Sequence, residues 1–135
     1  MKNISLRAFA GNKCKTADLT FKMSEITATN VFVVTQVSIV KKYVDGKATD
    51  EVEGVNYTLT DPQTFAQIRV KALTTTPVVT QEKLDANNTP IYIEIPLDET
   101  VVKPYKIDFG TVSLSITAPY VKLAKDVDLV DVDTL

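Results

Sequence analysis

Apolar and polar residues alternate along much of the chain with a period of two, the pattern of strands that bury one face of a sheet. Val, Ile, Thr, Tyr and Phe dominate these segments, and Gly, Pro and Asn-containing turns separate them. The sequence therefore predicts a mainly β protein. The clearest alternating apolar sets are Leu19, Phe21 and Met23; Ile91, Ile93 and Ile95; and Val112, Leu114 and Ile116.

The stretch 37–71 predicts three successive strands. A long β run at residues 30–42, with a bulge or bend expected at Thr35 and Gln36, leads to Asp45-Gly46. That pair supplies the two positive φ angles of a type I′ hairpin turn. A return strand follows, and Pro62 ends it because proline has no donor for a ladder. Residues 65–73 form the third strand.

A short helix is expected after the third strand. Thr80 is a suitable N-cap, Glu82 favours the first turn, and Leu84 is expected to point inward. The order of elements predicts a five-stranded Greek-key barrel of the oligonucleotide/oligosaccharide-binding type, with one short helix between strands 3 and 4. A β-sandwich or jelly roll is the alternative. We expect one domain at residues 1–125 and an acidic, flexible tail at 126–135.

The composition excludes several kinds of chemistry. The chain has no His, a single Cys and only four Gly, so a His-based triad, a thiolate metal cluster and a phosphate-cradling glycine loop cannot be written. We therefore predict a protein that is not an enzyme and needs no cofactor or metal. No apolar run is long enough to span a bilayer, no signal peptide is evident, and Cys14 cannot form an internal disulfide. These features predict a cytoplasmic protein.

The charge is unevenly distributed. The ten residues from Asp126 hold four of the 17 acidic residues and none of the 15 basic ones, so residues 1–125 carry a formal charge of +2 although the whole chain carries −2. A mildly basic body with an acidic tail is compatible with an anionic ligand. The tail alternates acidic with apolar residues. It is expected to dock a protein partner, to pair with a neighbouring subunit, to compete with nucleic acid, or to have no specific role.

Basic and aromatic side chains recur on the predicted strands, and together they are suited to gripping a phosphate backbone and stacking bases. An ordinary solvated surface is the alternative. We interpret Phe21, Phe32 and Phe65 as core, whereas Phe109 is either core or a stacking residue at a loop tip. The candidates for nucleic-acid binding are Lys41, Lys42, Tyr43 and Lys47 on the hairpin, Tyr57 on its return strand, Arg69 and Lys71 on the third strand, and Tyr92 and Tyr105 further on.

Several short motifs follow one another across residues 30–122: a hairpin with Gly-Lys, a Gly-Val-Asn-Tyr return strand, F-x-x-I-x-V-K, a helix, Pro-Ile-Tyr-Ile, Lys-Pro-Tyr and V-S-L-S-I-x-A. This layout resembles the small single-stranded-DNA-binding proteins of phages and conjugative plasmids of Gram-positive bacteria. The chain departs from that group in having no Trp and no Pro-Phe ending. The resemblance implies sequence-independent coating of single strands in replication or transfer, by dimers or cooperative filaments, without catalysis or a cofactor.

A non-catalytic structural or assembly protein, such as a phage virion or decoration component, is the alternative function. The Ser- and Thr-rich strands and the alternating tail of the chain suit that role equally well. A carbohydrate-binding domain would be expected to expose Trp, and the chain has none.

Overall fold

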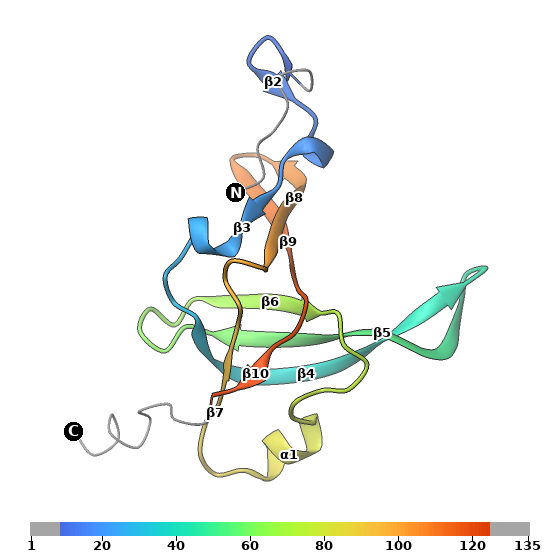
Figure 1. Cartoon of the computed structure of the whole chain (residues 1–135), viewed down its shortest axis with the longest axis vertical. Coiled ribbons are helices and arrows are strands. Elements are labelled where there is room, and N and C mark those ends of the chain that lie inside the picture. The colour runs from blue at the N-terminus through green and yellow to red at the C-terminus, as the bar shows by residue number, and fades with distance from the viewer. Residues whose placement is uncertain (1–8, 125–135) are drawn as a thin grey trace.

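The computed structural model of the chain describes residues 9–124. The predicted tail at residues 126–135 lies outside the described residues. The protein is mainly β, as the alternation predicts (Figure 1). Its strands are β1 (Phe9–Ala10), β2 (Lys13–Cys14), β3 (Phe21–Lys22), β4 (Val31–Val44), β5 (Lys47–Thr60), β6 (Gln67–Ala72), β7 (Ile91–Glu94), β8 (Val101–Asp108), β9 (Thr111–Ala118) and β10 (Lys122–Leu123).

Eight of the strands form one sheet in the order β10-β7-β4-β5-β6-β9-β8-β3, while β1 and β2 form a separate pair. The β4, β5 and β6 strands make an antiparallel meander, and β6 pairs with β9 in parallel. The hydrogen-bonded order does not return on itself, so the ladder of this sheet is not closed into a barrel. The five-stranded barrel therefore remains a prediction.

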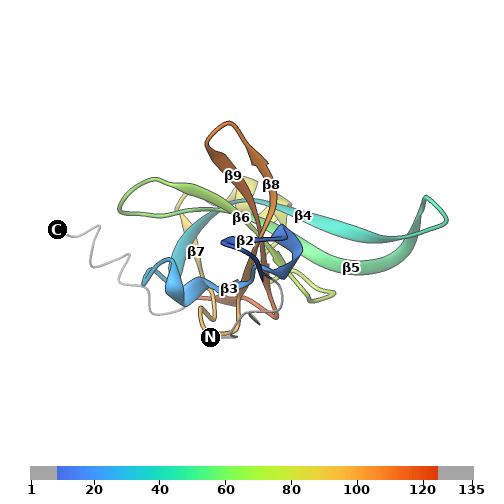
Figure 2. The same ribbon diagram turned by 90° about the horizontal axis from the view of Figure 1, so that it is seen from above.

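The β4–β5 hairpin confirms the predicted turn. Asp45 and Gly46 have φ angles of 52° and 79°, and Val44 pairs with Lys47 across them. The pairing register shifts between Val34 and Gln36, which confirms the bulge expected there. From Val40 and Gly54 outward, where β5 is no longer paired with β6, the hairpin extends away from the rest of the molecule as a two-stranded arm, residues 40–54 (Figures 1 and 2).

The short helix is also confirmed, as α1 (Gln81–Ala86) between β6 and β7. The Thr80 side chain caps it by accepting a hydrogen bond from the Lys83 N–H at 3.1 Å, and Leu84 packs against the core. The Gln81 side-chain oxygen accepts a hydrogen bond from the Val37 N–H at 2.8 Å. This bond joins the helix to β4 just beyond the bulge.

The core shows that the sheet curls. Ile93 of β7, Val70 of β6 and Ile116 of β9 belong to one buried cluster. Because β7 and β9 are four places apart in the sheet, they would lie about 19 Å apart if the sheet were flat. A shared cluster therefore requires the sheet to coil strongly. The pairing of β10 with β7 agrees with this, because β10 follows β9 closely in the sequence.

Two expectations about burial and one about strand length were wrong. Phe65 is not core, since its side chain is 77% exposed. Of the three alternating apolar residues of β9, Ile116 alone is buried, while Val112 and Leu114 are exposed, because the outer half of β9 belongs to a projecting hairpin with β8. The segment around Phe21 forms only a two-residue strand, followed by the 3₁₀ turn η3 (Met23–Glu25).

Candidate nucleic-acid interface

A groove of about 450 Å³ opens on the sheet where β6 and β9 separate. Arg69 and Lys71 of β6 and Tyr105 of β8 all line it. The two cations reach it because they alternate with Val70 and Ala72, which are fully buried on the opposite face. The fold thus brings together three of the residues predicted to bind nucleic acid. Tyr105 lies more than 30 positions after Arg69 and Lys71 in the sequence.

Tyr105 reaches the groove through a β-bulge. The β8–β9 register shifts between Pro104 and Lys106, and Tyr105 has no partner in that register. Pro104 is buried, whereas the Tyr105 side chain is 65% exposed. A bulge leaves its extra residue unpaired and redirects its side chain. The phenol ring is therefore displayed to solvent beside two cations, which is the combination that base stacking requires.

Lys71 is held in place by its neighbours on β5. A Cβ atom at Gly54 would come within 3.1 Å of the Lys71 Cε and 2.7 Å of the Ala72 carbonyl oxygen, so the lysine chain passes over a position that only glycine can occupy without displacement. Its ammonium lies 3.3 Å from the Glu53 carboxylate. Both side chains keep contact with solvent, so this ion pair contributes little to stability and can be exchanged for a phosphate.

No carboxylate lines the groove among the described residues, although Glu53 lies at its margin. A second hollow of about 420 Å³ differs in this respect. Glu94 and Asp98 line it together with a single cation, Lys122. Of these two hollows among the described residues, the first therefore has the charge needed to hold a phosphate backbone.

The hairpin candidates form a separate group on the projecting β4–β5 arm. Lys41, Lys42, Tyr43 and Lys47 are all exposed, and Tyr43 is 67% exposed, as predicted for the tip of a hairpin. None of the four lines the groove. The arm is not a purely basic surface, since four acidic residues accompany its lysines: Asp45, Asp50, Glu51 and Glu53.

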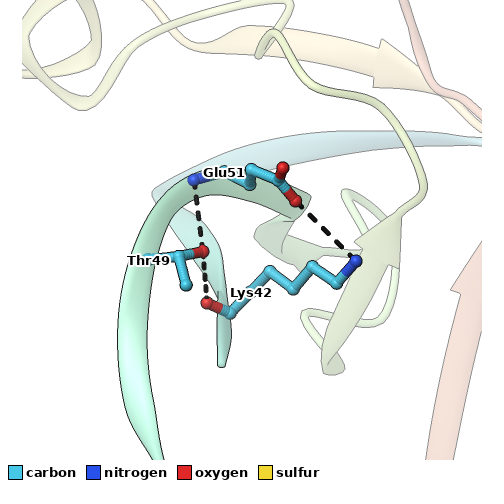
Figure 3. Close-up of polar contacts among 3 residues, drawn as sticks. All are labelled: Lys42, Thr49 and Glu51. Atoms are coloured by element: carbon cyan, nitrogen blue, oxygen red, sulfur yellow. Dashed lines mark hydrogen bonds and ion pairs between the residues drawn. The ribbon is translucent and has the colours of Figure 1, made fainter. Parts of the chain in front are cut away.

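Figure 3 shows how the arm holds Lys42. The Thr49 hydroxyl donates a hydrogen bond to the Lys42 carbonyl oxygen at 2.7 Å and accepts one from the Glu51 N–H at 3.3 Å. The Lys42 ammonium lies 3.7 Å from the Glu51 carboxylate, and both side chains are more than half exposed. Such a pair is weak in water, so Lys42 remains available to an anionic ligand.

The structure removes Tyr57 from the interface. Its side chain is fully buried, and its hydroxyl accepts a hydrogen bond from the Val78 N–H at 3.0 Å. A ring in the core cannot stack on a base. Burial raises the pKa of Tyr57, with the Val78 hydrogen bond acting in the opposite direction. Tyr92 lies on β7, is half-buried, and does not line the groove.

Comparisons of the chain with protein-family models, curated protein sequences and solved structures found no match. Among residues 9–124, no helix is long and apolar enough to cross a membrane.

Sequence reasoning missed part of the groove wall. Asn56 and Thr58 of β5 line it, as does the exposed Leu114 of β9. The signal for the β5 residues was present, because Val55, Tyr57 and Leu59 alternate with Asn56 and Thr58. That alternation places Tyr57 with the apolar residues and the two polar side chains on the outer face. Leu114 could not be found this way, since its exposure depends on how far the hairpin projects.

Proposed function

We propose that this protein binds single-stranded DNA without sequence preference and coats it during the replication or transfer of phage or plasmid DNA. The observation that carries the proposal is the groove that joins Arg69 and Lys71 to Tyr105. Two cations beside an exposed aromatic ring can neutralise phosphates and stack a base at the same site. The exposed Tyr43 and its neighbouring lysines provide further contacts of both kinds from the arm.

We further propose that the fold is the five-stranded oligonucleotide-binding type. In this proposal β4, β5, β6 and β7 are its first four strands, and the chain from β9 to β10 acts as one bent fifth strand. Two observations support it: β9 pairs in parallel with β6, and β10 pairs with β7. The position of α1 between β6 and β7 also fits. In that fold, the face of strands 2 and 3 and the 1–2 and 4–5 loops bind the ligand.

This assignment supports the location of the site. Strands 2 and 3 correspond to β5 and β6, which supply Arg69 and Lys71. The 1–2 loop corresponds to the β4–β5 arm with Tyr43, and the 4–5 connection includes β8 with Tyr105. The proposal requires no catalysis and no cofactor. Coating also implies self-association as dimers or filaments, and the acidic tail is proposed as a contact for another protein.

The test is a titration of a labelled oligothymidine of about 30 nucleotides, followed by fluorescence anisotropy, with a duplex of the same length as the comparison. We expect tighter binding to the single strand and a steep loss of affinity as salt rises, because each phosphate contact releases condensed counterions. Equal affinity for both forms, or no binding even at low salt, would remove this function.

One observation favours a second function, that of a non-catalytic assembly protein. Ile107, Val112 and Leu114 lie on the β8–β9 hairpin and are each exposed by 44% or more. The register pairs Ile107 with Val112, so these two apolar side chains share one face of the hairpin. Analytical ultracentrifugation without and then with oligonucleotide separates the two functions, because an assembly protein would form oligomers that added oligonucleotide leaves unchanged.

A further inference from the structure

Two phenylalanines are displayed to solvent at unusual positions in the backbone. The Phe65 side chain is 77% exposed and that of Phe109 is fully exposed. Phe65 has a φ of 62° and Phe109 a φ of 35°, so both lie in the left-handed region that bulky residues rarely adopt. A large apolar ring gains nothing from packing at such a position, and its backbone conformation is strained. This combination indicates that the two rings do something other than stabilise the fold.

The turn that carries Phe65 is fixed by its own hydrogen bonds. The Phe65 N–H donates to the Asp61 carbonyl oxygen and the Asp61 N–H donates to the Ala66 carbonyl oxygen, both at 2.8 Å. The Asp61 carboxylate accepts from the Gln63 N–H at 2.8 Å and from the Thr64 N–H at 3.4 Å. These bonds hold the pKa of Asp61 below its usual value. The ring is therefore presented from an ordered turn rather than from a loose loop.

The turn that carries Phe109 can be compared with another turn in the same chain. Both the β4–β5 and the β8–β9 hairpins have two central residues with positive φ and Gly at the second position. The first hairpin uses Asp45 before its glycine, which is a favourable residue there, whereas the second uses Phe109. Asn or Asp would suit the second turn better, so local folding does not explain the ring.

The two turns lead into the two strands, β6 and β9, that line the candidate groove. Each immediately precedes a strand, and the two strands, β6 and β9, are paired in parallel from Val70 and Ile116 onward. Parallel strands begin at the same end of a sheet, and before this point β6 and β9 separate. Gln67, two residues after Phe65, lines the groove on one side, and Leu114 of the Phe109 hairpin lines it on the other. Figure 2 shows the green turn between β5 and β6 and the β8–β9 hairpin projecting from the sheet in different directions.

We infer that Phe65 and Phe109 are base-stacking residues that flank the groove, so that a single strand crossing Arg69 and Lys71 places bases against a ring on each side. The inference rests on the proposed function and extends it. The occupant is single-stranded DNA, since the groove between the rings supplies cations and no carboxylate among its described lining residues. Stacking on these rings would be independent of base sequence, because every base has an aromatic face.

The experiment separates stacking from charge by using two probes of equal charge. One is an oligothymidine of about 30 nucleotides, and the other is an abasic strand of the same length, which keeps the phosphates but offers nothing to stack. The variants are Phe65→Asn and Phe109→Asn, because asparagine tolerates positive φ and preserves both turns. Phe65→Tyr and Phe109→Tyr keep the aromatic face. Ile26→Asn removes a 53% exposed apolar side chain that does not line the groove.

We expect each asparagine variant to bind oligothymidine about tenfold more weakly than the unaltered protein and to bind the abasic strand equally well. The tyrosine variants and Ile26→Asn should match the unaltered protein on both probes. Thermal unfolding of the asparagine variants should show no loss of stability, since the strain at φ above zero is reduced.

The outcomes distinguish this inference from the proposed function. If the unaltered protein binds neither probe, the proposed function fails. If it binds oligothymidine but the asparagine variants bind oligothymidine equally well, the stacking roles are wrong and the function stands. The same conclusion follows if the unaltered protein binds the abasic strand as tightly as it binds oligothymidine. A change in sedimentation of the free variants with DNA binding intact would assign the rings to protein–protein contact, which also overturns the inference.

Discussion

At the scale of single residues, the same type of side chain can be buried or exposed, and its position on a strand decides which. Tyr57 and Tyr105 both lie on β-strands, yet one is fully buried and the other is 65% exposed. Tyr57 lies in register between Val37 and Val70, among apolar neighbours, whereas a bulge turns Tyr105 outward. The burial of Tyr57 is acceptable because its hydroxyl accepts the Val78 hydrogen bond.

Replacing Tyr57 by Phe tests this structural role. The substitution leaves the Val78 N–H without its acceptor, and we expect the free energy of unfolding to fall by about 1–2 kcal/mol, measured by urea denaturation. Binding of oligothymidine should not change. Tyr43→Phe, which alters an exposed ring, is the matched control and should leave stability unchanged. A clear loss of DNA affinity in Tyr57→Phe at unchanged stability would return this residue to the interface.

The raised pKa of Tyr57 in the folded protein predicts how the difference in stability between the unaltered protein and Tyr57→Phe depends on pH. The unfolded chain loses this proton near pH 10, before the folded protein does, so the unfolded state gains stability at alkaline pH. The contribution of Tyr57 is therefore complete below about pH 10 and is lost as the pH rises through the folded-state pKa. The difference in stability between the unaltered protein and Tyr57→Phe should shrink above about pH 10.

At the scale of elements, the sequence predicted what is local and missed what depends on distant pairing. The β4–β5 turn, the bulge near Thr35 and the capped helix α1 each follow from a few adjacent residues, and all were predicted. The groove depends on the parallel pairing of β6 with β9, more than 40 residues apart, and no short pattern encodes that register. Phe65 was misassigned to the core because a ring in a strained turn is not expected from its residue type.

The arm offers a prediction at this scale, because one of its lysines, Lys42, is paired with one of its own carboxylates, Glu51. Glu51→Gln releases Lys42 and removes a negative charge from the proposed path of the phosphates. We expect affinity for oligothymidine to rise about two- to fivefold at low salt, and the gain to fade as salt screens the charge. Thermal stability should be nearly unchanged, since an exposed pair contributes little.

Glu82→Gln is the control for this change, because it removes an exposed carboxylate from α1, which contributes no residue to the groove or the arm. It alters the net charge by the same amount. If Glu82→Gln raised affinity as much as Glu51→Gln, overall charge rather than the arm would be responsible, and the arm would not be a contact surface.

At the scale of the whole molecule, the chain is slightly acidic, with a formal charge of −2, so its long-range field does not attract nucleic acid. Any affinity must come from local cations held at short range. Arg69 and Lys71 are the only cations among the described residues that line the groove. Binding that depends on these two should therefore show a measurable change in salt dependence when they are removed.

The double variant Arg69→Ala/Lys71→Ala measures that contribution. For single strands each lost phosphate contact reduces the slope of log affinity against log salt by about 0.7, so the slope should become less steep by about 1.4. Lys13→Ala/Lys83→Ala removes the same charge from exposed positions on β2 and α1, and its slope should equal that of the unaltered protein. Because the slope counts contacts rather than total charge, equal slopes for both double variants would place the phosphates elsewhere, whatever the loss of affinity.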